Sequence, residues 1–387
     1  MNPLLAIFIV FLVYAIGDAI ATFSKAYLSM ILIASIIFMV AFWLGLPRTL
    51  FADAVLLMLN RVTIGMLILH FGSTIKLRHL TSDWKVVVIS VVTCFAVACG
   101  CYFIGRLFID GYYALAGAPI AAGGNVAYLI MQSAYKGLNR PDVETFAVLV
   151  LIFHTFGGVL VASFLCKKVG IGVREQYRAG TLETKALDFG AGQPRKKLIP
   201  ELPEKFRTSN TIFAKAAFLV FIAGLLAEVT GVSMLVFALL LGFIGAELGF
   251  LEEVALDKAG GFNFIMPTAL VAVFSGLAGS TPSMVASMLV PLVIFLLIGL
   301  AVIFVSGIIM AKIIGYDWRV SVIVGTTACY GFLIGQVVAK EVATSLGESE
   351  DEKKALMDFF LPKMLIGGVL SMFIVSAVAA SIMSKWF

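Results

Sequence analysis

Charged residues are scarce in this sequence. Asp, Glu, Lys and Arg together make up 13% of the 387 residues, hydrophobic residues make up 61%, and the mean hydropathy is +1.05. Soluble globular domains carry about twice this charged fraction. The composition therefore argues against a soluble protein and indicates a polytopic membrane protein whose main partner is the lipid bilayer. The net charge of +5 comes from basic residues in loops, so no nucleic-acid partner is expected.

Motifs for catalysis and metal binding are also lacking. The sequence has no His-Glu-x-x-His, Gly-x-Ser-Gly or Gly-x-Gly-Asp pattern, so no intramembrane protease is indicated. The five cysteines have no metal-ligand spacing and lie in or beside apolar segments, where small buried side chains are the expected role. We therefore expect no enzyme activity, no cofactor and no metal centre, apart from a Na⁺ coupling ion.

The chain contains twelve apolar stretches of roughly 20 residues, the length that crosses a bilayer as a helix. The first has no basic start and no cleavage site, so it is expected to be retained. The stretches cover residues 4–23, 27–45, 54–73, 84–108, 112–135, 143–166, 211–229, 232–250, 262–280, 284–311, 316–340 and 355–384. The polar stretch between the two sets of six predicts a first transmembrane repeat (1–166), a cytoplasmic loop (167–210) and a second transmembrane repeat (211–387).

Short motifs recur in order about 210 residues apart. Gly72-Ser73-Thr74 is repeated as Gly279-Ser280-Thr281, and Gly157-Gly158-Val159-Leu160 as Gly367-Gly368-Val369-Leu370. Between them, two glycines of "LAGAPIAAGG" fall opposite two glycines of "IVGTTACYGF". The ordered matches at nearly one offset predict a duplicated six-segment unit.

The basic residues indicate how the two units face. If the fifth segment of each unit enters and leaves the membrane on one side, most basic residues gather on the inner face. The inner set is Lys25, Lys76, Arg78, Lys85, the 167–207 cluster, Lys258, Lys312, Arg319, Lys353 and Lys354, and the outer set is Arg48, Arg106, Lys136, Arg140 and Lys385. A spanning fifth segment would violate this bias. The prediction is an all-α polytopic membrane protein of two inverted repeats, each with five transmembrane helices and one re-entrant broken helix. We expect it in the bacterial inner membrane, with both termini outside.

The fifth segments contain the candidate substrate site. Gly-Gly-Asn interrupts "APIAAGGNVAYLIM", and irregular backbone at membrane depth persists only inside protein or beside a water-filled cavity. Asn125 is expected as the N-cap of a half-helix whose positive end can hold a carboxylate, while free carbonyls can hold sodium. Two opposed tips would meet near the midplane. The predicted substrate-binding residues are Gly123, Gly124 and Asn125 from one tip and Thr326, Thr327, Tyr330 and Gly331 from the other.

Each of several other polar residues has two possible roles. Ser73, Thr74, Ser280 and Thr281 end the third segments and serve either as helix caps or as ligands of an ion. Arg61 either snorkels to the outer surface or binds an anion. His154 is either a hydrogen-bonded interior residue or a proton carrier. No carboxylate lies at either tip, which favours sodium coupling over proton coupling.

Several segments together resemble the bacterial glutamate:sodium symporter family. They are "GYYALAGAPIAAGGNVAYLIMQ", "FAVLVLIFHTFGGVLVASFLCKK" and "YDWRVSVIVGTTACYGFLIGQVVA", with "HFGSTIKL" and "SGLAGSTPSM" in place. The resemblance implies inverted repeats, a mobile core carrying both hairpins, a homodimeric scaffold and sodium-driven uptake by an elevator-like movement. The family has His-Gly-Thr after the paired glycines, whereas this chain has Asn125-Val126-Ala127, which removes a ring and a hydroxyl from the tip.

These observations predict a sodium-coupled symporter for a small carboxylate-bearing solute, such as an amino acid or an organic acid. The alternatives are a proton-coupled organic-anion permease or exporter, in which His154 or Asp18 would titrate, and a channel.

Overall fold

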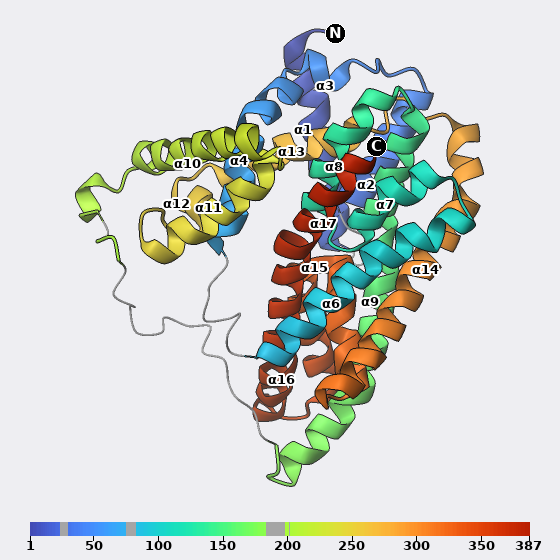
Figure 1. The fold of residues 1–387 in the computed structure, drawn as a ribbon, viewed down its shortest axis with the longest axis vertical. Helices are drawn as coiled ribbons and strands as arrows, with labels where there is room; N and C mark the ends of the chain where they lie inside the picture. The colour runs from blue at the N-terminus through green and yellow to red at the C-terminus, as the bar shows by residue number, and fades with distance from the viewer. Residues whose placement is uncertain (24–29, 75–82, 183–197, 201) are drawn as a thin grey trace.

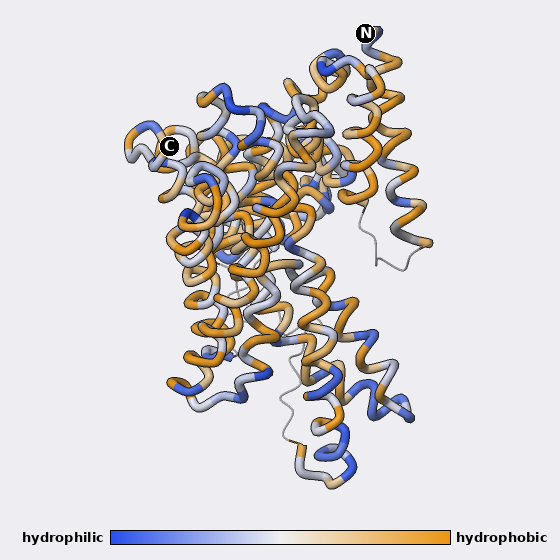
Figure 2. The backbone as a smooth tube through the Cα atoms, turned by 90° about the vertical axis from the view of Figure 1, so that its right-hand side faces the viewer, coloured by the Kyte–Doolittle hydropathy of each residue, from blue (hydrophilic) through white to orange (hydrophobic). Residues whose placement is uncertain are grey.

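The protein is helical throughout the part that the structure describes. This computed structural model describes all residues except 24–29, 75–82, 183–197 and 201 (Figure 1). Within the described residues, seven helices are long and apolar enough to cross a membrane, and three shorter apolar helices accompany them. Figure 2 shows hydrophobic residues along most of their length and hydrophilic ones at their ends. The predicted class, an all-α membrane protein, is confirmed at this level.

Helices occupy every predicted apolar stretch. In the first half they are α1 (Pro3–Phe23), α2 (Met30–Trp43), α3 (Leu50–Asp53), α4 (Leu56–Thr74), α6 (Trp84–Phe103), α7 (Gly111–Ala121), α8 (Asn125–Tyr135) and α9 (Pro141–Arg178). In the second half they are α10 (Ser209–Thr230), α11 (Met234–Leu248), α12 (Ala255–Lys258), α13 (Phe262–Ser275), α14 (Pro282–Ile314), α15 (Trp318–Leu346), α16 (Glu350–Val369), the π-helix η4 (Leu370–Val375) and α17 (Ser376–Met383).

Helix α9 is longer than the sequence predicted. It continues through Lys167, where the 167–210 loop was expected to begin, as far as Arg178. Val169, Gly170 and Val173 are buried on this extension, and a Cβ at Gly170 would lie 2.6 Å from the side chain of Leu346. At 1.5 Å per residue, α9 is about 57 Å long, well beyond a hydrocarbon core of about 30 Å. The prediction of a loop from residue 167 is therefore wrong, because packing against α15 continues the helix outside the bilayer.

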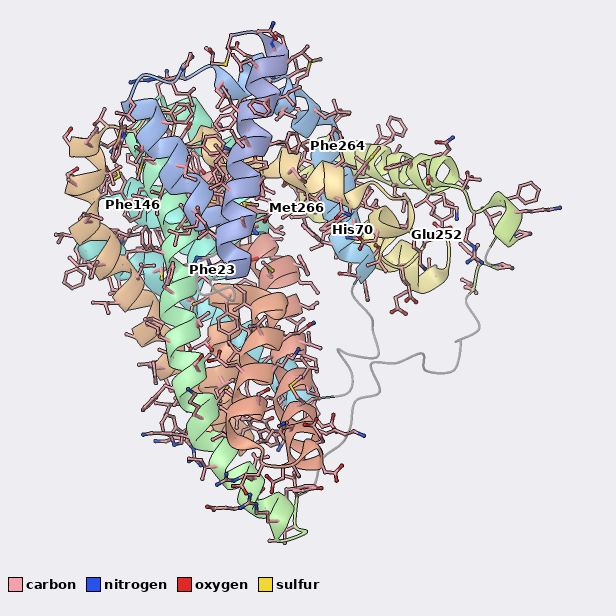
Figure 3. All side chains as sticks on the ribbon, turned by 180° about the vertical axis from the view of Figure 1, so that it is seen from behind. Phe23, His70, Phe146, Glu252, Phe264 and Met266 are labelled. Atoms are coloured by element: carbon pink, nitrogen blue, oxygen red, sulfur yellow. The ribbon has the colours of Figure 1, made fainter. Side chains whose placement is uncertain are left out.

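The helices form two groups. Helices α6–α9 and α14–α17 with η4 pack lengthwise as one bundle, here called the long-helix bundle. Helices α4 and α10–α12 lie to one side of it (Figure 1), and we call them, with α1–α3 and α13, the side group. Figure 3 shows His70 and Glu252 in the side group, away from Phe146 on α9. The rings of Phe71 and Phe373 stack 4.8 Å apart and join the two groups.

The two ends of the long-helix bundle carry different segments. The start of α7 and the end of α8 lie beside the C-terminus, since the rings of Tyr112 and Tyr135 lie 6.2 and 6.1 Å from that of Phe387. The end of α15 lies at the opposite end, where its Leu346 carbonyl accepts a 3.0 Å hydrogen bond from Arg174 of α9. Helix α14 runs down to this same end before α15 begins (Figure 1). The first broken segment therefore starts and finishes at one end, and α15 at the other.

Candidate functional site

The first break lies where the paired glycines predicted it. Helix α7 ends at Ala121, and the amides of Gly123 and Gly124 both donate to the Ile120 carbonyl, at 3.2 and 2.7 Å. Gly124 has φ +72°, a backbone conformation that glycine adopts without a Cβ penalty. Its carbonyl accepts from Tyr128 at 3.0 Å, so Gly124 is the N-cap of α8. The prediction of Asn125 as N-cap is wrong by one residue, and Asn125 is the first residue of the helix.

The second break lies at Gly331, inside α15. This residue has φ +70° and ψ −169° between two helical legs. Thr326 and Thr327 are fully buried in the first leg, and their hydroxyls donate to Ile323 and Val324 carbonyls at 2.7 and 2.6 Å. Those two threonines were predicted at the second tip and lie instead about one turn before Gly331, where each hydroxyl bonds back to its own helix.

The two breaks rest on the same turn of the last helix. A Cβ at Gly123 would overlap the Ser376 side chain and the Ser371 carbonyl, and a Cβ at Gly331 would lie 2.6 Å from the sulfur of Met372. All three partners lie in or directly after the π-helix η4. A π-helix inserts one extra residue and widens the turn, and such turns are frequent at functional sites. The wide turn gives both tips a surface that they approach closely.

A cavity of about 100 Å³ lies between the breaks. It is lined from the first tip by Gly123, Gly124 and Asn125, from α15 by Ala328, Cys329, Tyr330, Gly331 and Ile334, from α9 by Leu151, Ile152, His154 and Thr155, and by Ile31 and Met372. This lining contains no Asp, Glu, Lys or Arg. Within the described residues, no group of three or more His, Cys, Asp or Glu side chains is placed to hold a metal. Any sodium ion bound here would be held by carbonyl, hydroxyl or amide oxygens.

His154 is the site residue that the sequence left undecided. Its side chain is 6% exposed, and Nδ1 lies 3.0 Å from the Val150 carbonyl. This bond places the proton of the neutral ring on Nδ1, which leaves Nε2 as an acceptor. Nε2 faces the first tip, because a Cβ at Gly124 would lie 3.6 Å from it. The hydrogen-bonded interior position predicted for His154 is present, and it forms a wall of the cavity.

Three further lining residues carried no distinct sequence signal. Thr155 donates from its hydroxyl to the Cys329 carbonyl at 3.1 Å and so ties α9 to the first leg of α15. Met372 and Ile31 contribute apolar surface. Threonine, methionine and isoleucine are common in apolar helices, and only the packing of four distant segments distinguishes these three.

The four Ser and Thr residues at the ends of the third segments bond to nearby backbone groups, Thr281 as a helix cap, and do not line the cavity. The Ser73 hydroxyl accepts from the Ala255 amide at 3.1 Å, and the Thr281 hydroxyl accepts from the Met284 amide at 3.2 Å, as an N-cap of α14. The hydroxyls of Thr74 and Ser280 donate back to their own segments at 2.7 Å. Of the two interpretations left open by the sequence, the geometry favours capping.

Two predicted charged residues also lie away from the cavity. Arg61 is exposed on α4, in the side group, and Asp18 is exposed on α1. Neither lines the space between the tips. For Arg61 the position fits the outward-facing alternative, in which the long side chain reaches the membrane surface.

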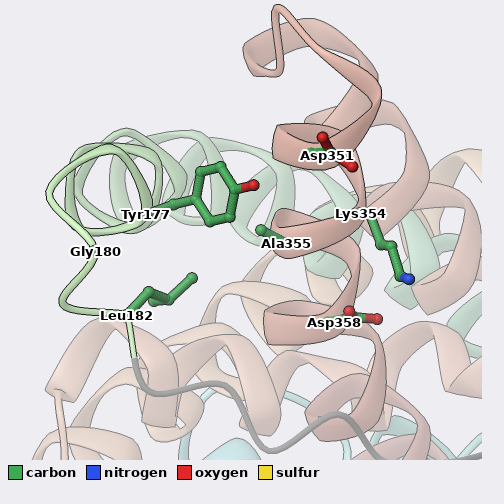
Figure 4. Close-up of a pocket in the computed structure, with 7 residues that line it drawn as sticks. All are labelled: Tyr177, Gly180, Leu182, Asp351, Lys354, Ala355 and Asp358. Atoms are coloured by element: carbon green, nitrogen blue, oxygen red, sulfur yellow. The ribbon is translucent and has the colours of Figure 1, made fainter.

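A second cavity, of about 300 Å³, lies between the ends of α9 and α16 (Figure 4). Its lining residues are Tyr177, Gly180, Leu182, Asp351, Lys354, Ala355 and Asp358. Next to it, Arg178 pairs with Glu352 at 2.7 Å. This cavity is polar and charged and lies at helix ends that extend past the apolar region, so it is a less suitable place for solute to cross the membrane than the cavity between the breaks.

No known family profile matches the chain, and no curated protein is significantly similar to it.

Proposed function

We propose that the protein is a sodium-coupled symporter of small carboxylate-bearing solutes. One observation carries the proposal: two broken helices, far apart in the sequence, line a single cavity. Broken helices at membrane depth supply a positive helix end for an anion and free carbonyls for a cation. The cavity lining offers these backbone groups together with Asn125 and the ring of His154, while the hydroxyl of Tyr330 lies 3.2 Å from that of Thr326.

Inverted repeats are part of the proposal. The legs of the first broken segment start and finish at the end that carries the C-terminus, and α15 starts and finishes at the opposite end. Two related units of opposite orientation would produce this arrangement. In the bacterial inner membrane, the end with Arg174 and Arg178 would face the cytoplasm and both termini would lie outside.

We also propose that the long-helix bundle moves against the side group, which would form the contact of a homodimer. The amide of Gln132 donates to the Ala272 carbonyl of α13 at 2.7 Å, and the hydroxyl of Tyr128 donates to it at 3.3 Å. These bonds join the first broken segment to the side group. A movement of the bundle would exchange them for other partners, as hinge and shear transitions require.

The proton-coupled permease remains the alternative, and His154 is the observation in its favour. A titratable ring on the cavity wall is what a proton carrier needs. Transport that continues without sodium and stops when the proton gradient is dissipated would select this alternative.

The proposed function is tested first by ligand-dependent thermal stability. Purified protein is heated with a panel of amino acids and organic acids, in sodium chloride and in choline chloride. We expect at least one carboxylate to raise the midpoint, and to raise it more in sodium, because ligands that bind only the folded state stabilise it. If no carboxylate shifts the midpoint in either salt, the proposal is wrong.

A further inference from the structure

The absence of charged side chains in the cavity lining limits how many carboxylate groups a substrate can carry. None of its lining side chains is an acid or a base that is charged at neutral pH. An ionised carboxylate transferred into such a site without a partner costs many kcal/mol. One carboxylate has a partner here, since the first amides of α8 point out of the helix with no intrahelical acceptor. The rest of the lining is largely apolar, with Leu151, Ile152, Ile334 and Met372, and it offers a second carboxylate no charged partner.

The cavity also presents an acceptor that no protein group uses. His154 is more than nine-tenths buried, and its Nδ1–H donates to the Val150 carbonyl. Among the described residues no donor is recorded for Nε2, which faces Gly124 on the cavity wall. Nε2 is therefore an acceptor on the cavity wall to which a ligand that carries a hydrogen-bond donor can bind.

The two features lie on the same tip. Nε2 faces Gly124, and Gly124 is the N-cap of the helix whose free amides begin at Asn125. A ligand whose carboxylate sits on those amides therefore places the adjacent atoms next to His154. The volume of about 100 Å³ is below the roughly 300 Å³ at which pockets for drug-sized ligands begin, so the ligand is compact.

We propose that the substrate is a compact monocarboxylate that carries a hydrogen-bond donor, an ammonium or a hydroxyl group, next to the carboxylate, and that Nε2 of His154 accepts from this donor. The inference rests on the proposed function and narrows it to small amino acids and hydroxy acids. It excludes dicarboxylates such as glutamate and succinate as preferred substrates.

The test compares matched ligands on purified full-length protein in sodium chloride. L-Alanine and L-lactate carry the donor, propionate has the same carbon skeleton without it, and succinate and L-glutamate carry a second carboxylate. We expect apparent dissociation constants from thermal stabilisation at least about 10-fold lower for L-alanine or L-lactate than for propionate, with succinate and L-glutamate weaker still.

Variants of His154 test whether Nε2 causes the preference for ligands that carry a donor. In His154→Leu the ratio between the donor ligand and propionate should fall to about 1, and in His154→Gln, which keeps an acceptor, part of the ratio should return. The two dissociation constants are compared within one variant. A general loss of stability would affect both ligands alike and would leave their ratio unchanged. His70→Leu is the control, because His70 is also buried but its Nδ1 accepts from Leu256 in the side group. This control should keep the wild-type ratio.

The outcomes separate the two proposals. If succinate or L-glutamate binds wild-type protein more tightly than the monocarboxylates, or if His154→Leu keeps the full ratio, the inference is wrong and the symporter proposal stands. If none of the five ligands binds but another carboxylate of the panel does, the inference is wrong and the symporter proposal stands. If no carboxylate of the panel binds in sodium or in choline, both proposals fail.

Discussion

At the scale of single residues, the tip glycines serve different purposes. Gly124 and Gly331 have positive φ, so their backbone conformation is the constraint. Gly123 has ordinary dihedral angles, and its constraint is the close approach to Ser371 and Ser376. Gly123 is thus needed for contact with the last helix, and Gly124 for the turn itself.

The close approach at Gly123 predicts a loss of stability on substitution. Gly123→Ala would push the first tip off the π-helix, and overpacking of this kind costs about 1–3 kcal/mol. Gly172→Ala is the matched control, since Gly172 lies within α9 with no atom within 4 Å of an added Cβ and alanine is the better helix former. Thermal unfolding in detergent should show a lower midpoint for Gly123→Ala only. Equal midpoints for the two variants would contradict the described packing.

Asn125 gives a second prediction at this scale. Its side-chain amide lines the cavity and has no recorded hydrogen bond to the described residues. Asn125→Ala should therefore leave the unfolding midpoint without ligand nearly unchanged and weaken carboxylate binding about 10-fold, through loss of one hydrogen bond to the ligand. Unchanged binding would remove Asn125 from the site.

The sequence predicted part of the site. Paired glycines in an apolar segment predicted the first break, because glycine is the residue that such a turn requires. The position of the second tip was not predicted to the residue, because Thr326, Thr327 and Tyr330 have the same pattern in a tip and on a buried helix face. Thr155, Met372 and Ile31 were not predicted, since they become lining residues only through tertiary packing.

At the scale of elements, the π-helix η4 is the feature that joins the two breaks. Residues in it or directly after it contact both tip glycines. The hydroxyl of Ser371 also donates to the Gly367 carbonyl at 2.8 Å, which satisfies part of the widened turn. This element could not be predicted from the sequence, because a single extra residue in an apolar helix hardly changes its periodicity. The end of α9 at Arg178 could not be predicted either, because it depends on packing against α15.

Removal of the extra residue is a test of that element. Deletion of Met372 should convert η4 to α-helix and leave α16 and α17 continuous, so the protein should still assemble but lose ligand-dependent stabilisation. Met372→Leu keeps the residue count and is the control, which should retain stabilisation. Wild-type stabilisation in the deletion variant would mean that the wide turn is not needed at the site.

At the scale of the whole molecule, a transporter with this fold requires that opposite ends of the long-helix bundle face opposite sides of the membrane. Gly137 lies between α8 and α9, at the end with the C-terminus, and is exposed with open space around it. Gln176 is exposed near the end of α9 at the other end. In the orientation that we propose from the positive-inside bias, Gln176 faces the cytoplasm.

Cysteine labelling tests this orientation. Of the five native cysteines only Cys99 is exposed, so Cys99→Ala provides the background. In intact cells a membrane-impermeant maleimide should label Gly137→Cys, and should label Gln176→Cys only after permeabilisation. Labelling of both from outside would contradict the predicted topology.

The central claim is that a sodium gradient drives a carboxylate through the cavity between the two breaks. The most direct measurement is uptake of the radiolabelled carboxylate that stabilises the protein most, into proteoliposomes with sodium or choline outside. The account predicts accumulation above the external concentration only with an inward sodium gradient, and its loss when sodium is equal on both sides. Equal accumulation in choline, or accumulation abolished only by a proton ionophore, would contradict it.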